Sequence, residues 1–243
     1  MSGGASKAPG PRGSTRRDAG ARAGPRRPER AARAPIPRSG RRARPEAEAR
    51  RQAILDAALA VFAARGYEAA RLDDVAAQAG VAKGTLYLYF KDKQALFEEL
   101  VRGAVGPIMA RIGSAALAPE HSPSQVIDMF FQLFQRDVLD TKRKLLLRLI
   151  IAEGPRFPAI AAFYHREVVA RGMTLMRKLA SEAVARGEFS SDAAARYPQL
   201  IVAPLLLAVI WDGLFSKIEP LDVAGLLAAH RDLLSAGAGK TAP

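Results

Sequence analysis

Residues 71–93 read RLDDVAAQAGVAKGTLYLYFKDK, and this stretch decides the fold. Its pattern predicts a short helix over about 72–79, a tight turn at Gly80-Val81 and a second helix over about 83–90. Gly80 suits the turn because glycine adopts positive φ without a steric penalty. A small core would fix the angle between the helices, built from Val75, Ala79, Val81, Leu86 and Phe90. This is the pattern of a helix-turn-helix, whose second helix enters the major groove of DNA.

The outward surface of the second helix carries the side chains expected to read DNA. With Leu86 and Phe90 facing inward, that surface consists of Lys83, Gly84, Thr85, Tyr87, Leu88 and Tyr89. Hydroxyls and amines can reach phosphates or base edges, and an outward leucine can touch a thymine methyl. Lys93 begins the next helix, where free N–H groups add to its charge, so it is expected to bind a phosphate. The alternative is that these are ordinary surface side chains.

The stretch closely resembles the tetracycline-repressor (TetR) family of bacterial transcription regulators. The resemblance covers about residues 48–100 and is carried by Ile54-Leu55-Asp56-Ala57-Ala58-Leu59, Phe62, Gly66-Tyr67, Val75-Ala76, Ala79-Gly80-Val81, Lys83 to Phe90, Lys93 and Ala95-Leu96-Phe97. It implies that Thr85, Tyr87, Tyr89 and Lys93 contact DNA, with Lys83 and Gly84 beside them.

Two positions depart from the family pattern. Arg71 and Leu72 stand where the family usually has a Thr or Ser cap, and Ala82 replaces the usual Ser before the recognition helix. Losing a hydroxyl cap typically costs about 1 kcal/mol. Arg71 could instead reach a phosphate, so it joins the expected DNA-binding residues.

Helical periodicity dominates the rest of the chain and predicts an all-α fold. The expected helices cover about 46–65, a segment from Asp92 onward with Asp92 as its N-cap, a segment from Ser122-Pro123 onward, 141–152, 158–186, 192–215 and 221–235. Gly106-Pro107 is expected to break the chain, and no alternating strand pattern occurs.

Charge divides the chain into unequal parts. The net charge is +13, yet residues 1–45 hold thirteen Lys and Arg against two acids, a net +11. With seven Gly and seven Pro, residues 1–45 are predicted to be a disordered basic tail. It could attract phosphate or have no specific role. Residues 46–105 would be the DNA-binding domain, and residues 106–243 a ligand-binding and dimerisation domain. Since 46–105 carries a net −1, Asp73, Asp74, Glu98 and Glu99 must face away from DNA, or the tail must add attraction.

The second domain follows from the resemblance, and residues 148–158 look like those of AcrR-like regulators of efflux pumps. Apolar and aromatic side chains are expected to line a pocket for a small apolar ligand, or else to be plain core: Met129, Phe130, Phe134, Tyr164, Met173, Met176 and Trp211. The last two helices carry more apolar side chains than one buried face of each helix can use, and in the family these helices form a homodimer interface. A twofold dimer would match a palindromic operator in double-stranded DNA.

Other classes find little support in the sequence. The chain has no cysteine and three scattered histidines, so no metal or other cofactor is expected. No catalytic motif occurs, so no enzyme is expected. The longest apolar run, Leu200 to Trp211, is short for a membrane span. We therefore predict a cytoplasmic transcription regulator, a repressor released by its ligand. The alternatives are a non-specific nucleic-acid packaging protein driven by the tail and a helical enzyme acting on apolar small molecules.

Overall fold

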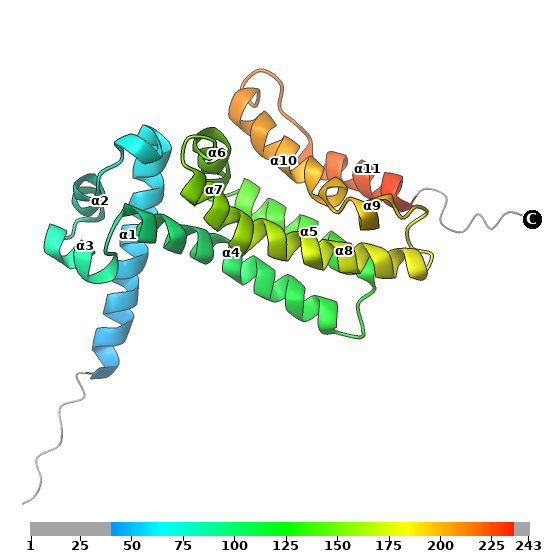
Figure 1. Cartoon of the computed structure of the whole chain (residues 1–243), viewed down its shortest axis with the longest axis horizontal. Helices are drawn as coiled ribbons and strands as arrows, with labels where there is room; N and C mark the ends of the chain where they lie inside the picture. The colour runs from blue at the N-terminus through cyan, green and yellow to red at the C-terminus, as the bar shows by residue number, and fades with distance from the viewer. Residues whose placement is uncertain (1–39, 236–243) are drawn as a thin grey trace, which may run out of the picture. The chain divides into compact units, whose positions relative to one another are not determined.

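The computed structural model describes residues 40–235, and this part of the chain is helical with no strand (Figure 1). The all-α prediction is thereby confirmed for these residues. The first helix, α1 (Gly40–Ala69), begins six residues before the expected start at Glu46. Because proline favours the first turn, Pro45 had suggested a helix start, yet α1 passes through it. The other residues of the predicted tail, 1–39, lie outside the described part.

The helix-turn-helix forms as predicted. It consists of α2 (Leu72–Ala79) and α3 (Lys83–Tyr89), joined by a turn in which Gly80 has φ +67°. Leu86 and Val75 are almost completely buried beneath it. Neither Arg71 nor Ala82 caps its helix with a side chain, which leaves the N-termini of α2 and α3 without the family's hydroxyl caps.

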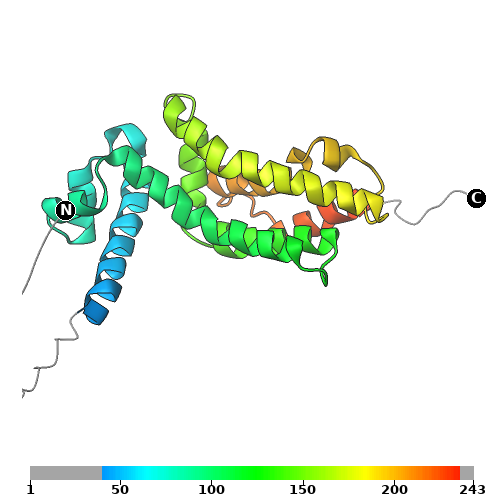
Figure 2. The ribbon, with the colours of Figure 1, turned by 60° about the horizontal axis from the view of Figure 1, so that its bottom comes forward.

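The helix α4 (Lys93–Leu117) is continuous, so the break expected at Gly106-Pro107 is wrong. Asp92 caps its start as predicted, with a carboxylate oxygen 2.7 Å from the Ala95 nitrogen. A proline inside a helix costs about 3 kcal/mol. Burial of apolar side chains on both sides of Pro107, among them Val101 and Ile108, offsets this cost. Figure 2 shows α4 running from the α1–α3 group along the remaining helices.

The rest of the described chain forms a second group of helices. These are α5 (Pro123–Phe134), the π-helical turn η1 (Gln135–Leu139), α6 (Lys144–Glu153), α7 (Pro158–Tyr164), the π-helical turn η2 (His165–Val169), α8 (Ala170–Ala185), α9 (Ala193–Arg196), α10 (Gln199–Leu214) and α11 (Val223–Ser235). The helix expected over 192–215 is divided at Tyr197-Pro198, because the residue before a proline avoids helical backbone.

Two large cores hold the helices together. One joins α1–α4 with α6 and α7, through residues such as Phe62, Phe97 and Leu149. The other joins α4 and α5 with α8–α11, through residues such as Ile112 and Leu205. The proposed domains 46–105 and 106–243 therefore share α4 and part of the first core.

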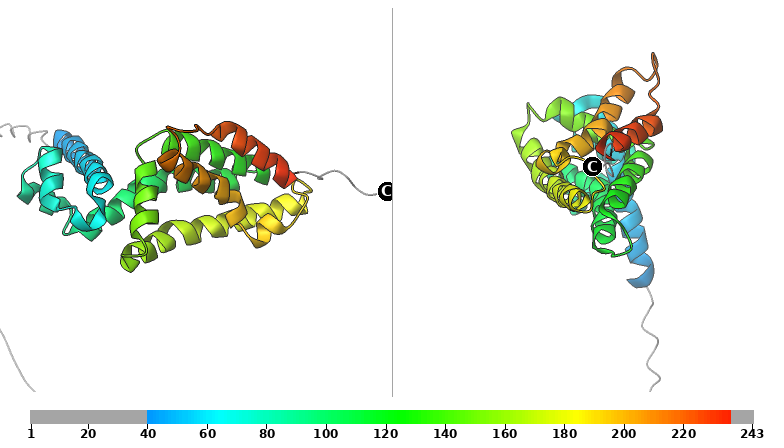
Figure 3. Two further views of the ribbon diagram at one scale, coloured as in Figure 1. Left: turned by 90° about the horizontal axis from the view of Figure 1, so that it is seen from above. Right: turned by 90° about the vertical axis from the view of Figure 1, so that its right-hand side faces the viewer.

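The helices α10 and α11 lie together at the surface of the second group, in orange and red in Figure 3. Ile201 and Leu205 of α10 are fully buried, whereas Leu207 and Leu214 are 46% and 64% exposed. Within residues 40–235, none of the helices combines the length and apolarity that crossing a bilayer requires.

Candidate functional site

The outer face of α3 presents the side chains that the sequence assigned to DNA. Leu88 is 85% exposed and Tyr87 is 45% exposed, although both are large and apolar or aromatic. Lys83 and Gly84 are also exposed, while Thr85 and Tyr89 are half-buried. An 85% exposed leucine gains nothing from the fold, so its position suits contact with another molecule.

Acidic side chains near α3 are held in ion pairs. Lys83 Nζ lies 2.8 Å from Asp73, and this hydrogen bond raises the pKa of Lys83. Arg65 lies 2.6 Å from Asp74. On α4, Glu98 and Glu99 pair with Arg102. The acids that the sequence required to face away are therefore neutralised by internal partners, and Lys83 must give up its ion pair with Asp73 if it binds DNA.

Lys93 has a structural task that the sequence did not reveal. Its Nζ donates hydrogen bonds to the carbonyl oxygens of Tyr67 and Glu68, at 2.7 and 2.8 Å, and lies 4.7 Å from the centre of the Tyr67 ring. Burial lowers the pKa of Lys93. Two of its three N–H groups thus bind the end of α1, which leaves one for a phosphate. Arg71 is exposed and makes no ion pair with another described residue.

The end of α1 also contacts the α6–α7 corner. The Tyr67 and Phe157 rings pack edge to face with centroids 5.2 Å apart, and Arg156 lies 2.5 Å from Glu68. Gly66 has φ +75°, and a Cβ there would stand 2.5 Å from a Glu153 oxygen. The segment 148–158, which the sequence linked to efflux-pump regulators, thereby lies against the end of α1.

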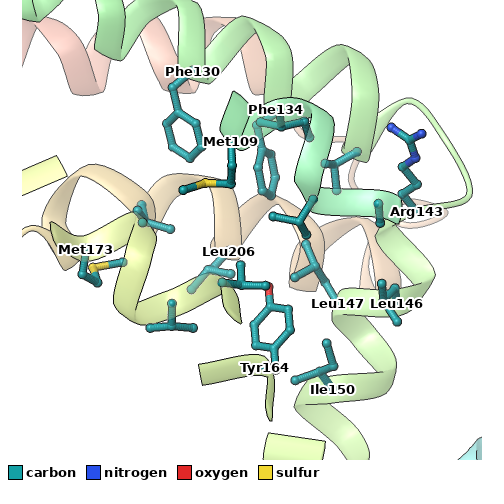
Figure 4. Close-up of a pocket in the computed structure, with 18 of the residues that line it drawn as sticks. Met109, Phe130, Phe134, Arg143, Leu146, Leu147, Ile150, Tyr164, Met173 and Leu206 are labelled. Atoms are coloured by element: carbon teal, nitrogen blue, oxygen red, sulfur yellow. The ribbon is translucent and has the colours of Figure 1, made fainter. Parts of the chain in front are cut away.

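A cavity of about 350 Å³ lies among α4–α8 and α10. Five of the seven residues expected to bind a ligand line it: Phe130, Phe134, Tyr164, Met173 and Met176. The first four are labelled in Figure 4. Other walls come from Met109, Leu146, Leu147, Ile150 and Leu206. Both π-helical turns contribute, η1 through Val138 and η2 through Val168 and Val169. Such turns are often found at functional sites.

Two expected ligand residues do not line this cavity, so their assignment to it is corrected. Met129 lies on another face of α5, where it borders an outer groove together with Arg111 and Arg136. Trp211 donates from Nε1 to the carbonyl oxygen of Glu219 at 2.7 Å and packs against Phe215. Neighbouring residues on a helix point about 100° apart, which explains why Phe130 faces the cavity and Met129 does not.

Few polar groups border the cavity. Burial raises the pKa of Tyr164 to about 12, and its hydroxyl makes no hydrogen bond with another described residue. The others are the neutral Gln199 and the cation Arg143. Such a lining suits a molecule that is mostly apolar.

A short helix, a glycine turn with positive φ and an exposed second helix form a helix-turn-helix, the motif that many DNA-binding proteins place in the major groove. The profile of "Bacterial regulatory proteins, tetR family" matches residues 54–100, which span α1 to α4. Residues 54–100 of the chain are therefore similar to the DNA-binding part of tetR-family regulators.

Individual relatives agree with this assignment. The HTH-type transcriptional regulator AcrR of Shigella flexneri is 32% identical over 113 residues, which make up 45% of this chain and only about half, 52%, of that protein. The HTH-type transcriptional repressor BepR of Brucella suis is 29% identical over 179 residues, 70% of this chain and 81% of that protein. The crystal structure of FadR from Bacillus subtilis in complex with stearoyl-CoA has a similar fold, with a TM-score of 0.59 and 23% identity over 76% of this chain and 98% of that one.

Proposed function

We propose that this protein is a cytoplasmic, sequence-specific DNA-binding transcription regulator, a homodimeric repressor that a small apolar ligand releases from DNA. The observation that carries the proposal is the exposed face of α3, where Tyr87 and Leu88 extend from a helix-turn-helix of the tetR type. An exposed tyrosine and leucine on so short a helix have no stabilising role within one chain.

DNA contact would divide between base reading and phosphate binding. Lys83, Gly84, Thr85, Tyr87, Leu88 and Tyr89 would occupy the major groove, while Arg71 and Lys93 would bind phosphates on its flanks. Arg71 is exposed and available, whereas Lys93 would use its remaining N–H group.

Dimerisation would use the last two helices. Leu200, Leu207, Ile210 and Leu214 follow one stripe of α10 and are 40% to 64% exposed. Apolar stripes of this kind are typical of interfaces between copies of one chain. A second copy packed on α10 and α11 would bury the stripe and set the two α3 helices at a fixed separation for a palindromic operator.

Ligand release would act through the contacts at the end of α1. The cavity is lined by Leu146, Leu147 and Ile150 of α6, and Glu153 near the end of the same helix lies against Gly66. A ligand that prefers one arrangement of α6 would therefore favour one position of the DNA-binding helices. The shift is limited by the difference in ligand affinity between the two arrangements.

Selection of bound fragments from a random DNA pool tests the proposal. We expect an inverted repeat to be enriched. Tyr87→Ala should weaken binding to it by roughly 10- to 100-fold, because a base contact contributes about 1–3 kcal/mol. Tyr197→Ala removes another exposed tyrosine and serves as the matched control. No enriched sequence, or equal affinities for the two variants, would contradict the proposal.

A second experiment separates specific binding from the packaging alternative. Removing residues 1–39 takes away most of the basic tail and leaves α1 intact. We expect affinity to fall and its salt dependence to weaken, while preference for the selected sequence remains. Loss of that preference along with the tail would favour packaging instead.

A further inference from the structure

The cavity is lined by one charged side chain only, Arg143, among the described residues. In Figure 4 it lies on the opposite side of the labelled residues from Phe130 and Met173. Its guanidinium forms no ion pair with another residue in 40–235, and the residue as a whole is half-buried. The cavity thus has an apolar body and a cationic rim.

Arg143 has no carboxylate within ion-pair distance among the described residues. Asp137 is a nearby carboxylate, and it is already engaged by Arg136 at 2.7 Å and Arg111 at 3.4 Å. These arginines and Arg143 all lower the pKa of Asp137, and the hydrogen bond from Arg136 lowers it most. Asp137 therefore pairs with Arg136 and Arg111, and Arg143 stays available for an anion from outside the chain.

Given the proposed ligand-responsive function, we propose that the ligand is a single-chain amphiphile with an anionic head, its chain in the cavity and its head at Arg143. Charges do not enter an apolar cavity without a partner, so the head stays at the rim. Guanidinium groups bind carboxylates through paired, charge-assisted hydrogen bonds. If one chain carbon fills about the share of one water, ~30 Å³, 350 Å³ holds roughly a dozen carbons.

Tyr164 does not provide an equivalent head site. Its hydroxyl stays protonated at neutral pH, and the surrounding side chains, such as Ile150 and Leu206, are apolar (Figure 4). A neutral hydroxyl can donate one hydrogen bond but cannot neutralise a carboxylate. An anionic head placed there would lie among apolar groups without a counter-charge.

Calorimetric titration of the full chain with three twelve-carbon probes tests the inference. The probes are dodecanoate, 1-dodecanol and dodecyltrimethylammonium, each kept below its micelle concentration. We expect dodecanoate to bind about tenfold more tightly than dodecanol and the ammonium probe to bind least. Arg143→Gln should bring dodecanoate down to the affinity of dodecanol without changing dodecanol itself. Lys142→Gln removes an adjacent exposed charge and should change neither.

Several results would overturn the inference. Equal affinities for acid and alcohol, a preference for the ammonium, or no binding of any probe would each do so. So would a head-group preference that Tyr164→Phe abolishes and Arg143→Gln leaves intact. The titrations contain no DNA, so they are independent of the regulator proposal. Arg143-dependent dodecanoate binding in a protein that selects no DNA sequence would refute the regulator and keep the ligand class. If the protein selects an operator but dodecanoate and dodecanol release it equally, the regulator proposal stands and the ligand class is refuted.

Discussion

Lys93 offers the sharpest test of how the DNA-binding helices are held. Lys93→Met keeps much of the aliphatic stem over the Tyr67 ring and removes the two hydrogen bonds to the end of α1. A hydrogen bond from a charged donor contributes about 1.5–3 kcal/mol. Water can replace part of this at a half-buried site, so we expect a net loss of about 2 kcal/mol in the free energy of unfolding. Urea unfolding at fixed protein concentration measures it.

The matched control is Lys91→Met. Lys91 is exposed and lies 3.9 Å from Asp92, a pair that contributes little. We expect this variant to unfold like the wild type. Operator affinity measured against salt separates the two roles of Lys93, because loss of one phosphate contact lowers the salt slope by about 1. If Lys93→Met is as stable as Lys91→Met, the two hydrogen bonds from Lys93 to the end of α1 do not stabilise the fold, and our reasoning is refuted.

Three further changes test other parts of the fold. Gly66→Ala should destabilise by about 1–3 kcal/mol, because φ is +75° and an oxygen of α6 lies 2.5 Å from the new Cβ; Gly103→Ala, in an open helical position, should not. Lys and Arg side chains of α6 lower the pKa of Asp212. The stabilising effect of this carboxylate is therefore present at neutral pH and is lost as pH falls through its folded pKa. Thermal melts should show that Asp212→Asn loses less stability in acid than the wild type does. Leu214→Glu should yield monomers in sedimentation. Leu117→Glu changes a leucine of α4 that is even more exposed and should leave dimers; monomers from both variants would argue against the α10 interface.

Local features of the helix-turn-helix could be predicted from sequence because each depends on neighbours in the chain. The turn at Gly80, the burial of Leu86 and the Asp92 cap all follow from residues within a few positions. The exposed face of α3 follows from the same periodicity. Whether its residues contact DNA stays a prediction.

Features that depend on distant segments could not be predicted in this way. The hydrogen bonds of Lys93 could not be predicted because they depend on α1 ending beside the start of α4. The continuity of α4 through Pro107 depends on packing against other helices, which overrides the local signal. Periodicity identified an apolar face on α5 but not which of Met129 and Phe130 turned toward the cavity.

The unbroken course of α4 has a mechanical consequence. With 25 residues and about 1.5 Å of rise per residue, the helix is a rod of roughly 37 Å that has Lys93 at one end and Ile108 and Ile112 of the cavity wall farther along. If the helix moves as one body, a tilt of about 5° sweeps one tip by roughly 3 Å relative to the other. That displacement is close to the rise of one base pair, so a small adjustment beside the cavity is geometrically amplified to the scale on which DNA register is set.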